Sequence, residues 1–375
     1  MTMKTKTDIF NEYLAEYLKG SKDQKSLLLN HVCFVTKMHR KASIRKFRAL
    51  QLRDPYKQER RGRSEYYGPD VTVALKEIWE IGNEVCGELL FPMINEYVDI
   101  LLRDKLWKHG DDATAKLRAM KLATIKRRVG NFLKVRGRRS GISATRPSHL
   151  KHIIPTFSGP WKELPPGNGQ IDTVLHKDTV LGDAVYTLNY TDSATCLDIP
   201  RAQWNKGQEA TIESMKEIKQ RLPYPWLMAH PDTGGEFINY LAKDWFKENK
   251  IEFTRSRPGR KNDNMYVEER NGHVIRKMIG YANLDCREVA QYLNLYYDVM
   301  IPYLMHFVAV RRMLGKEKIL SKYKRIYEKI PKTPYQRILE HKSISEEVKE
   351  KLRQEHSKLN PLILKKEMEK RLKKV

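Results

Sequence analysis

Three acidic residues in the middle of the chain have the types and settings expected of a divalent metal site. Asp172 lies within 169–175, where hydrophobic and polar residues alternate as in a strand, and Asp232 follows the apolar segment 226–229. Glu268 comes after a further 35 residues, early in a predicted helix at 264–279. Because carboxylate oxygens are hard ligands, such a set suits Mg²⁺ or Mn²⁺.

Converging carboxylates of this kind can support phosphodiester chemistry. They can hold two divalent ions about 3.5 to 4 Å apart, one activating the attacking oxygen and one stabilising the leaving oxygen of an in-line displacement. This chemistry requires no protein nucleophile. The sequence contains no G-x-S-x-G, H-E-x-x-H or Walker motif. Metal-assisted phosphoryl transfer is therefore the interpretation that the motifs favour.

The elements around the acids predict an α/β core. Alternation predicts strands at 170–176, 184–191, 195–199, 226–229 and 251–254, and apolar periodicity predicts helices at 208–221, 237–248 and 264–279. This order predicts an antiparallel meander that crossover units extend into a mixed five-stranded sheet flanked by helices. Asp172 then lies within the first strand, and Asp232 lies just past the fourth.

The N-terminal part is predicted to be helical and to contact DNA. Residues 25–48 have the outline of a helix-turn-helix, because an apolar helix is followed by a short turn and a basic helix. We expect the second helix to present His39, Arg40, Lys41 and Arg45, with Ala42, Ile44 and Phe47 packed behind them. The alternative is an ordinary helical hairpin with a solvated basic face.

Further segments complete the predicted organisation. A helix-turn-helix domain at 1–55 is followed by a second helical block at 70–135, which offers another recognition helix carrying Lys126, Arg127 and Arg128. A basic linker at 136–168 leads to the catalytic core at 169–305, and a basic helical region at 306–375 ends the chain. Two such helix pairs in series would read a longer DNA site than one pair alone.

The distribution of charge is consistent with a nucleic-acid partner. The formal net charge is +25, of which residues 1–150 carry +14, residues 151–300 carry −1 and residues 301–375 carry +12. Basic flanks can bind phosphates by counterion release while a neutral centre holds metal, although a solvated surface or an RNA partner would give the same composition.

The four cysteines have no C-x-x-C spacing, and no run of 18 apolar residues occurs. We therefore expect a soluble intracellular protein with no membrane partner.

Three motifs in the core resemble one family. They are Gln-Ile-Asp at 170–172, His-Pro-Asp-Thr-Gly-Gly-Glu-Phe at 230–237, and Asn-Asp-Asn-Met-Tyr-Val-Glu at 262–268 with Asn271 three residues later. Together with the 35-residue separation, they make the sequence similar to the DDE transposases and integrases of bacterial insertion sequences. The core of that family is similar to retroviral integrase (rve) and adopts a ribonuclease H-like fold. The resemblance covers 169–305.

The resemblance implies a site and its partners. Asp172, Asp232 and Glu268 would bind two Mg²⁺ or Mn²⁺ ions, while Asn264 and Asn271 would line the DNA or support the glutamate. Where retroviral integrases have lysines four and seven residues after the glutamate, this chain has Gly272 and Ile275. DNA contacts are therefore expected at Arg270, Arg276 or Lys277. The implied partners are terminal inverted repeats, target DNA and further copies of the chain, in a bacterial nucleoid.

Three functions remain compatible with these residues. The first is a transposase that cleaves element ends and joins the 3′-hydroxyl to target DNA. The second is a catalytically silent DNA-binding regulator, and the third is a nuclease of the same fold. The intact triad favours the first, because a regulator gains nothing from clustered carboxylates that are costly to ionise together.

Helix geometry selects Glu268 over Glu269, because Glu268 shares its face with Asn264 and Asn271.

Overall fold

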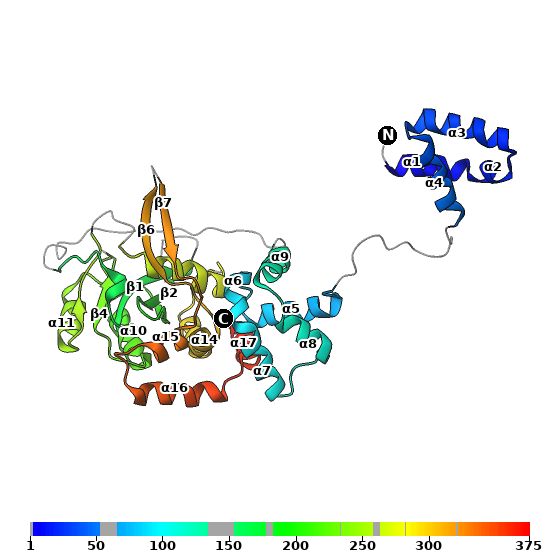
Figure 1. The fold of residues 1–375 in the computed structure, drawn as a ribbon. Helices are drawn as coiled ribbons and strands as arrows, with labels where there is room; N and C mark the ends of the chain where they lie inside the picture. The colour runs from blue at the N-terminus through cyan, green and yellow to red at the C-terminus, as the bar shows by residue number, and fades with distance from the viewer. Residues whose placement is uncertain are drawn as a thin grey trace. The chain divides into compact units, whose positions relative to one another are not determined.

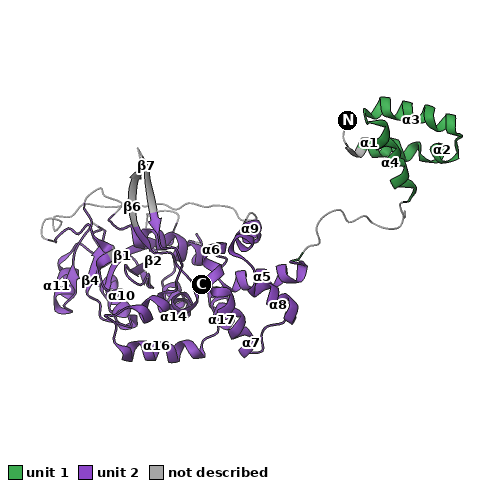
Figure 2. Ribbon diagram, viewed as in Figure 1, with its two compact units in different colours: residues 1–66 green, residues 67–375 purple. Residues whose placement is uncertain are grey.

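The computed structural model describes residues 3–52, 66–133, 154–177, 183–232, 234–257, 263–281, 283–319 and 322–375. The chain forms two compact units, residues 1–66 and 67–375 (Figure 1; Figure 2). The expected domain boundaries near residues 135 and 305 both fall inside the second unit. The reason is that the second helical block, the sheet and the C-terminal helices share apolar packing.

The first unit consists of four helices around a small apolar core. They are α1 (Met3–Glu12), α2 (Leu14–Lys19), α3 (Lys22–Thr36) and α4 (Arg40–Gln51). Phe10, Leu29, Val32 and Phe47 are buried between them. The α3–α4 pair stands where a helix-turn-helix was expected, and its reading of DNA stays a prediction. Ile44 was expected to pack inward but is 40% exposed, since Ser43 and Phe47 take the inward positions of α4.

A mixed five-stranded sheet forms the centre of the second unit, as predicted. Its strands are β1 (Asn168–Leu175), β2 (Val185–Asp192), β3 (Asp198–Trp204), β4 (Met228–Pro231) and β5 (Glu252–Phe253), in the order β3-β2-β1-β4-β5. The first three strands are antiparallel neighbours, whereas β4 runs parallel to β1 and β5 runs parallel to β4. The third strand starts three residues later than expected, because Asp192 holds a turn that includes left-handed Cys196.

Helices cover both faces of this sheet. One face packs against α10 (Gln208–Arg221) and α11 (Tyr240–Glu248), and shares a core with Ile171 and Leu188. The other face, which includes Val174, packs against α14 (Arg287–Phe307) and the segment made of α12 (Met265–Arg270), the π-helical turn η4 (Asn271–Arg276) and α13 (Lys277–Ile279). Strand alternation thus supplies an apolar face to each helical layer. No helix in the described part of the chain is long and apolar enough to cross a membrane.

The second helical block packs directly against the C-terminal helices. It comprises α5 (Pro69–Ile81), α6 (Gly87–Leu90), η1 (Phe91–Met93), α7 (Ile94–Arg103), α8 (Asp111–Arg118) and α9 (Leu122–Leu133). The Tyr303 hydroxyl donates to the Ile81 carbonyl over 2.6 Å, and Tyr97 donates to the Phe307 carbonyl. Phe307 of α14 is part of the core of this block. These contacts make the block part of the second unit.

The C-terminal region is only partly helical, which corrects the expectation for 306–375. An antiparallel hairpin of β6 (Met313–Ile319) and β7 (Lys322–Tyr327) precedes α15 (Pro334–Glu340), α16 (Glu346–Lys358) and α17 (Pro361–Leu372) (Figure 1). The hairpin segment lacks a 3.6-residue apolar period, and its residues Tyr323, Ile326 and Tyr327 favour strands. A short helical turn, η3 (Trp161–Glu163), precedes β1.

Candidate active site

Asp172 lies within β1 and is oriented through both carboxylate oxygens. Its Oδ1 accepts from the backbone N–H of Thr173 over 2.8 Å, and its Oδ2 accepts from Asn271 Nδ2 over 2.9 Å. Asn271 Oδ1 in turn accepts from Asn189 Nδ2 over 3.1 Å, and Asn189 pairs with Asp172 across the antiparallel strands. The carboxylate is therefore fixed by a backbone N–H of its own strand and by Asn271 of the π-helical turn, which Asn189 of β2 holds in place.

Asp232 lies beside Asp172 at the end of the neighbouring parallel strand. The β1–β4 register pairs Gln170 with His230 and Ile171 with Pro231, so the next residue along each strand is an aspartate. Asp232 Oδ1 accepts from the backbone N–H of Gly234 over 2.7 Å. Parallel pairing thus brings together two of the three predicted ligands.

The electrostatics of Asp172 reflect this closeness. Burial raises the pKa of Asp172 to about 8, and the charges of Asp232 and Glu236 contribute to the rise. The Thr173 N–H and the Lys206 ammonium act in the opposite direction. A divalent cation between the carboxylates would favour their ionised forms, as opposite charges generally do.

The helix that carries Glu268 is attached to β1 through a buried glutamine. Gln170 Oε1 accepts from the backbone N–H groups of Tyr266 (2.9 Å) and Val267 (3.2 Å). Gln170 Nε2 donates to the Asp263 carbonyl over 2.8 Å. A side chain two residues before Asp172 therefore satisfies the first amides of α12, which have no partner within the helix.

Asparagines at both ends of α12 reach the two aspartates. With its amide oriented to satisfy both neighbours, Asn264 donates to the His230 carbonyl (3.2 Å) and accepts from the Asp232 N–H (2.9 Å). Asn271 donates to the Asp172 carboxylate. Glu268 is four residues after the first asparagine and three before the second, so it shares their helical face. This supports Glu268 over Glu269 as the glutamate directed to the acids.

Glu268 itself is exposed, unlike Asp172. Within the described ranges, no three His, Cys, Asp or Glu residues are grouped so that they could hold a metal ion. The structure thus places the two aspartates together and Glu268 on the adjoining helix, without gathering all three. The triad as a ligand set stays a prediction.

Sequence reasoning overlooked two charged residues beside the aspartates. Glu236 is 7% exposed, and its carboxylate accepts from Thr173 Oγ1 over 2.9 Å and pairs with the Lys206 ammonium. Glu236 lies in the same motif as Asp232, which was a usable signal. Lys206 lies in the turn after β3, and nothing in the sequence connects it with a residue 30 positions away.

The predicted DNA contacts after Glu268 all have partners within the protein. Arg270 forms an ion pair with the buried Asp198, so it holds α12 against β3. The guanidinium of Arg276 lies 5.2 Å from the ring centroid of Tyr281, and Lys277 donates to the Asn83 carbonyl. A DNA contact by Arg270 would require loss of the buried ion pair, so its structural role is the better supported one.

The predicted recognition helices differ in how their basic residues are used. In α9, Lys126 pairs with Glu88, Arg128 donates to the Tyr67 carbonyl over 2.8 Å, and Arg127 is exposed. In α4, Arg40 donates to Ser26 Oγ over 2.8 Å and to Asn30, which ties it to α3. Lys41 and Arg45 are exposed. Exposed Arg127, Lys41 and Arg45 keep the predicted DNA-binding role.

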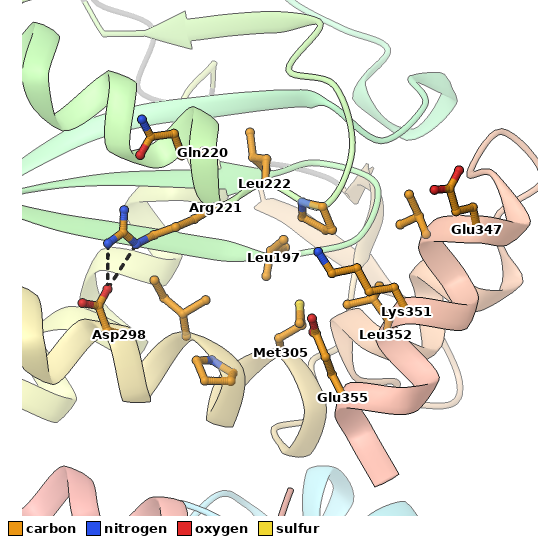
Figure 3. A pocket seen from close by; sticks show the side chains of 14 residues that line it. Leu197, Gln220, Arg221, Leu222, Asp298, Met305, Glu347, Lys351, Leu352 and Glu355 are labelled. Carbon is orange, nitrogen blue, oxygen red and sulfur yellow. Dashed lines mark hydrogen bonds and ion pairs between the residues drawn. The ribbon is translucent and has the colours of Figure 1, made fainter. Parts of the chain in front are cut away.

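A hollow of about 540 Å³ lies elsewhere in the second unit, between the end of α10, α14 and α16 (Figure 3). Apolar side chains such as Leu222 and Met305 line it, and Arg221 donates to Asp298 at its edge over 3.0 and 3.1 Å. None of the predicted site residues lines this hollow.

Comparisons with known proteins identify a relative and several solved structures. No family model matches the chain. The uncharacterized protein y4rM of Sinorhizobium fredii is 29% identical over 343 residues, which cover 88% of this chain and 95% of that protein. The catalytic core domain of BIV integrase is 17% identical, covers 34% of this chain and 80% of its own, and has a TM-score of 0.27. The HTLV-2 integrase catalytic core domain, in complex with magnesium, is 16% identical, covers 39% and 92%, and has a TM-score of 0.29.

Proposed function

We propose that this chain is a DDE-type DNA transposase that cleaves the ends of a DNA element and joins the 3′-hydroxyl to target DNA. The observation that carries the proposal is the pairing of Asp172, fixed through both oxygens, with Asp232 at the end of the adjacent parallel strand. The motif spacing around these residues and Glu268 supports the same assignment.

The three acids suit a divalent metal by their chemistry, because carboxylate oxygens are hard ligands. Asp172 and Asp232 would hold the ions, and Glu268 would complete the ligand set from the face of α12 that it shares with Asn264 and Asn271. Bound Mg²⁺ or Mn²⁺ would supply an activated attacking oxygen and stabilise the leaving oxygen. The raised pKa of Asp172, caused by burial and then by Asp232, fits acids arranged for a cation.

The remaining residues orient these carboxylates and leave room for a large substrate. Asn271 and the Thr173 N–H fix the Asp172 carboxylate, and Gln170 fixes the start of α12. Glu268 is exposed, so the site opens at the surface, as a polymeric substrate requires. The excess positive charge of residues 1–150 and 301–375 would bind DNA phosphates.

The two other functions predict different products. A DNA-binding regulator would bind without altering DNA, and the electrostatic cost of the half-buried acid pair would have no purpose in it. A nuclease would cut without joining. A transposase would generate both cut ends and joined products, so one assay separates the three.

The test uses the full chain with DNA fragments taken from immediately outside its coding region. In Mg²⁺ or Mn²⁺, fragments that contain an element end should be nicked and joined to a target plasmid, and a chelator should abolish both reactions. Nicking without joining would indicate the nuclease. Binding with neither reaction would indicate the regulator and overturn the proposal.

A further inference from the structure

A third carboxylate lies next to the aspartate pair. Glu236 Oε1 accepts from Thr173 Oγ1 over 2.9 Å. Consecutive strand residues face opposite sides of a sheet. Glu236 therefore contacts Thr173 on one side of β1, whereas Asn271 contacts Asp172 on the other side. The loop that begins with Asp232 is thereby attached to the strand that carries Asp172.

Glu236 also lies close to Asp232 itself. A Cβ placed on Gly234 would be 2.6 Å from Glu236 Oε2 and 2.9 Å from Asp232 Oδ1. The two carboxylates therefore converge over this glycine, where a larger residue would separate them. The charges of Asp232 and Glu236 also raise the pKa of Asp172 on the neighbouring strand β1, so the three carboxylates act on one another electrostatically. Such a group repels itself unless a cation is close by.

Lys206 supplies that positive charge. It lies in the turn between β3 and α10, where left-handed Asn205 accepts from the Gly207 N–H over 2.7 Å. Its ammonium pairs with Glu236 and lies 6.0 Å from the ring centroid of Tyr186. Burial acts to lower the pKa of Lys206, but Glu236, Asp232 and Asp172 together raise it above the ordinary value. The ammonium thus contacts Glu236 directly, and the charges of Asp232 and Asp172 act on it electrostatically.

We propose that Lys206 is the resident counter-cation of the site: it pairs with Glu236, offsets the charges of Asp232 and Asp172 in the metal-free protein, and thereby lowers the affinity for a divalent ion. Lys206 is a positioning residue in this role. The part that concerns metal affinity rests on the proposed function, whereas charge compensation in the metal-free protein does not.

The first test is made in chelator. Lys206→Met should lower the Tm by about 1–2 °C, the shift that roughly 1 kcal/mol produces in a unit of about 310 residues. Asp232→Asn, which removes one negative charge, should recover most of that loss in the Lys206→Met background. Lys206→Arg should retain the wild-type Tm. Lys216→Met, which removes an exposed lysine paired with Glu213 on α10, is the matched control. If Asp232→Asn does not offset the loss, charge compensation is refuted.

The second test measures Mn²⁺ binding by calorimetry on the full chain. Lys206→Met should bind Mn²⁺ about tenfold more tightly than wild type, because one positive charge that opposes the ion is gone; tenfold corresponds to about 1.4 kcal/mol. Lys206→Arg should bind as wild type does. Unchanged or weaker binding by Lys206→Met would show that the lysine only holds the fold. Absence of Mn²⁺ binding by wild type would reject the proposed function. The chelator experiment alone would then decide whether Lys206 compensates the charge of the acids.

Discussion

The carboxyl group of Asp172 binds its proton far more tightly in the folded protein than in an unfolded chain. Burial, aided by Asp232, raises its pKa from 3.8 to about 8. Between these pH values the folded state holds a proton that the unfolded state has lost, so this group makes stability fall as pH rises. The decrease that it causes in the free energy of unfolding is absent below about pH 4 and complete above about pH 8.

This difference predicts a pH-dependent effect of Asp172→Asn. In chelator, the variant should be more stable than wild type at pH 8 and should lose that advantage as pH approaches 4, because the amide cannot ionise. Urea unfolding across this range measures the effect. Parallel stability curves for the two proteins would contradict the raised pKa.

The neighbouring glutamates Glu268 and Glu269 lie on different faces of α12. Glu268 shares a face with the two asparagines that contact the aspartates, whereas Glu269 is turned about 100° away. Glu268→Gln should eliminate DNA joining, while Glu269→Gln should retain at least about a tenth of it, a barrier increase of about 1.4 kcal/mol or less. A strand-transfer assay with both variants shows which glutamate is the metal ligand. The reverse pattern would assign that role to Glu269.

At the scale of elements, the attachment of α12 to β1 is the contact that determines where Glu268 lies. Gln170 makes three hydrogen bonds to backbone groups at the start of this helix. Gln170→Leu leaves those buried groups unpaired, which should cost about 1–3 kcal/mol of stability. We also expect at least a tenfold loss of DNA joining per folded molecule.

A control separates this loss from simple destabilisation. Asn360 caps α17 by accepting from the N–H groups of Leu362 and Ile363. Asn360→Ala should cost a comparable amount, about 0.5–2 kcal/mol, while joining per folded molecule stays near wild type. If both variants lose joining in proportion to their stability, Gln170 has no particular role in the site.

Local pattern predicted most of the sheet and its helices but few of the contacts between them. Alternation located β1, β2, β4 and β5 to within a few residues, and apolar periodicity gave the bounds of α10. The start of β3 was displaced because Asp192 organises the preceding turn through hydrogen bonds that sequence does not reveal. The hairpin after α14 was missed because its strands are rich in basic residues and lack a clear alternation of apolar and polar residues. Lys206 and Glu236 form a tertiary ion pair, to which no local period points.

At the scale of the whole molecule, the second unit should fold by itself only if it keeps its N-terminal helices. A fragment of residues 67–375 retains the core shared by α5–α9 and α14, including the Tyr303 contact with Ile81. A fragment that starts near residue 148 would expose that core and should aggregate. Size-exclusion chromatography and circular dichroism of both fragments test this.

The same fragments test where DNA binding lies. Without the first unit, residues 67–375 should lose most sequence-selective affinity for element ends. Because each neutralised phosphate contributes about −0.9 to the log-log salt slope, their binding should also depend less steeply on salt than that of the full chain. Full selective affinity in residues 67–375 would show that the first unit does not recognise the ends.

The central claim is that Asp172 and Asp232 perform metal-dependent DNA joining. Its most direct measurement is a strand-transfer assay with the full chain, in which Asp172→Asn and Asp232→Asn are compared with wild type and with Asp183→Asn, an exposed acid outside the site. We predict that the first two variants bind element ends within a few fold of wild type but give no joined product, whereas Asp183→Asn joins normally. Joining at the wild-type rate by either of the first two would contradict the account.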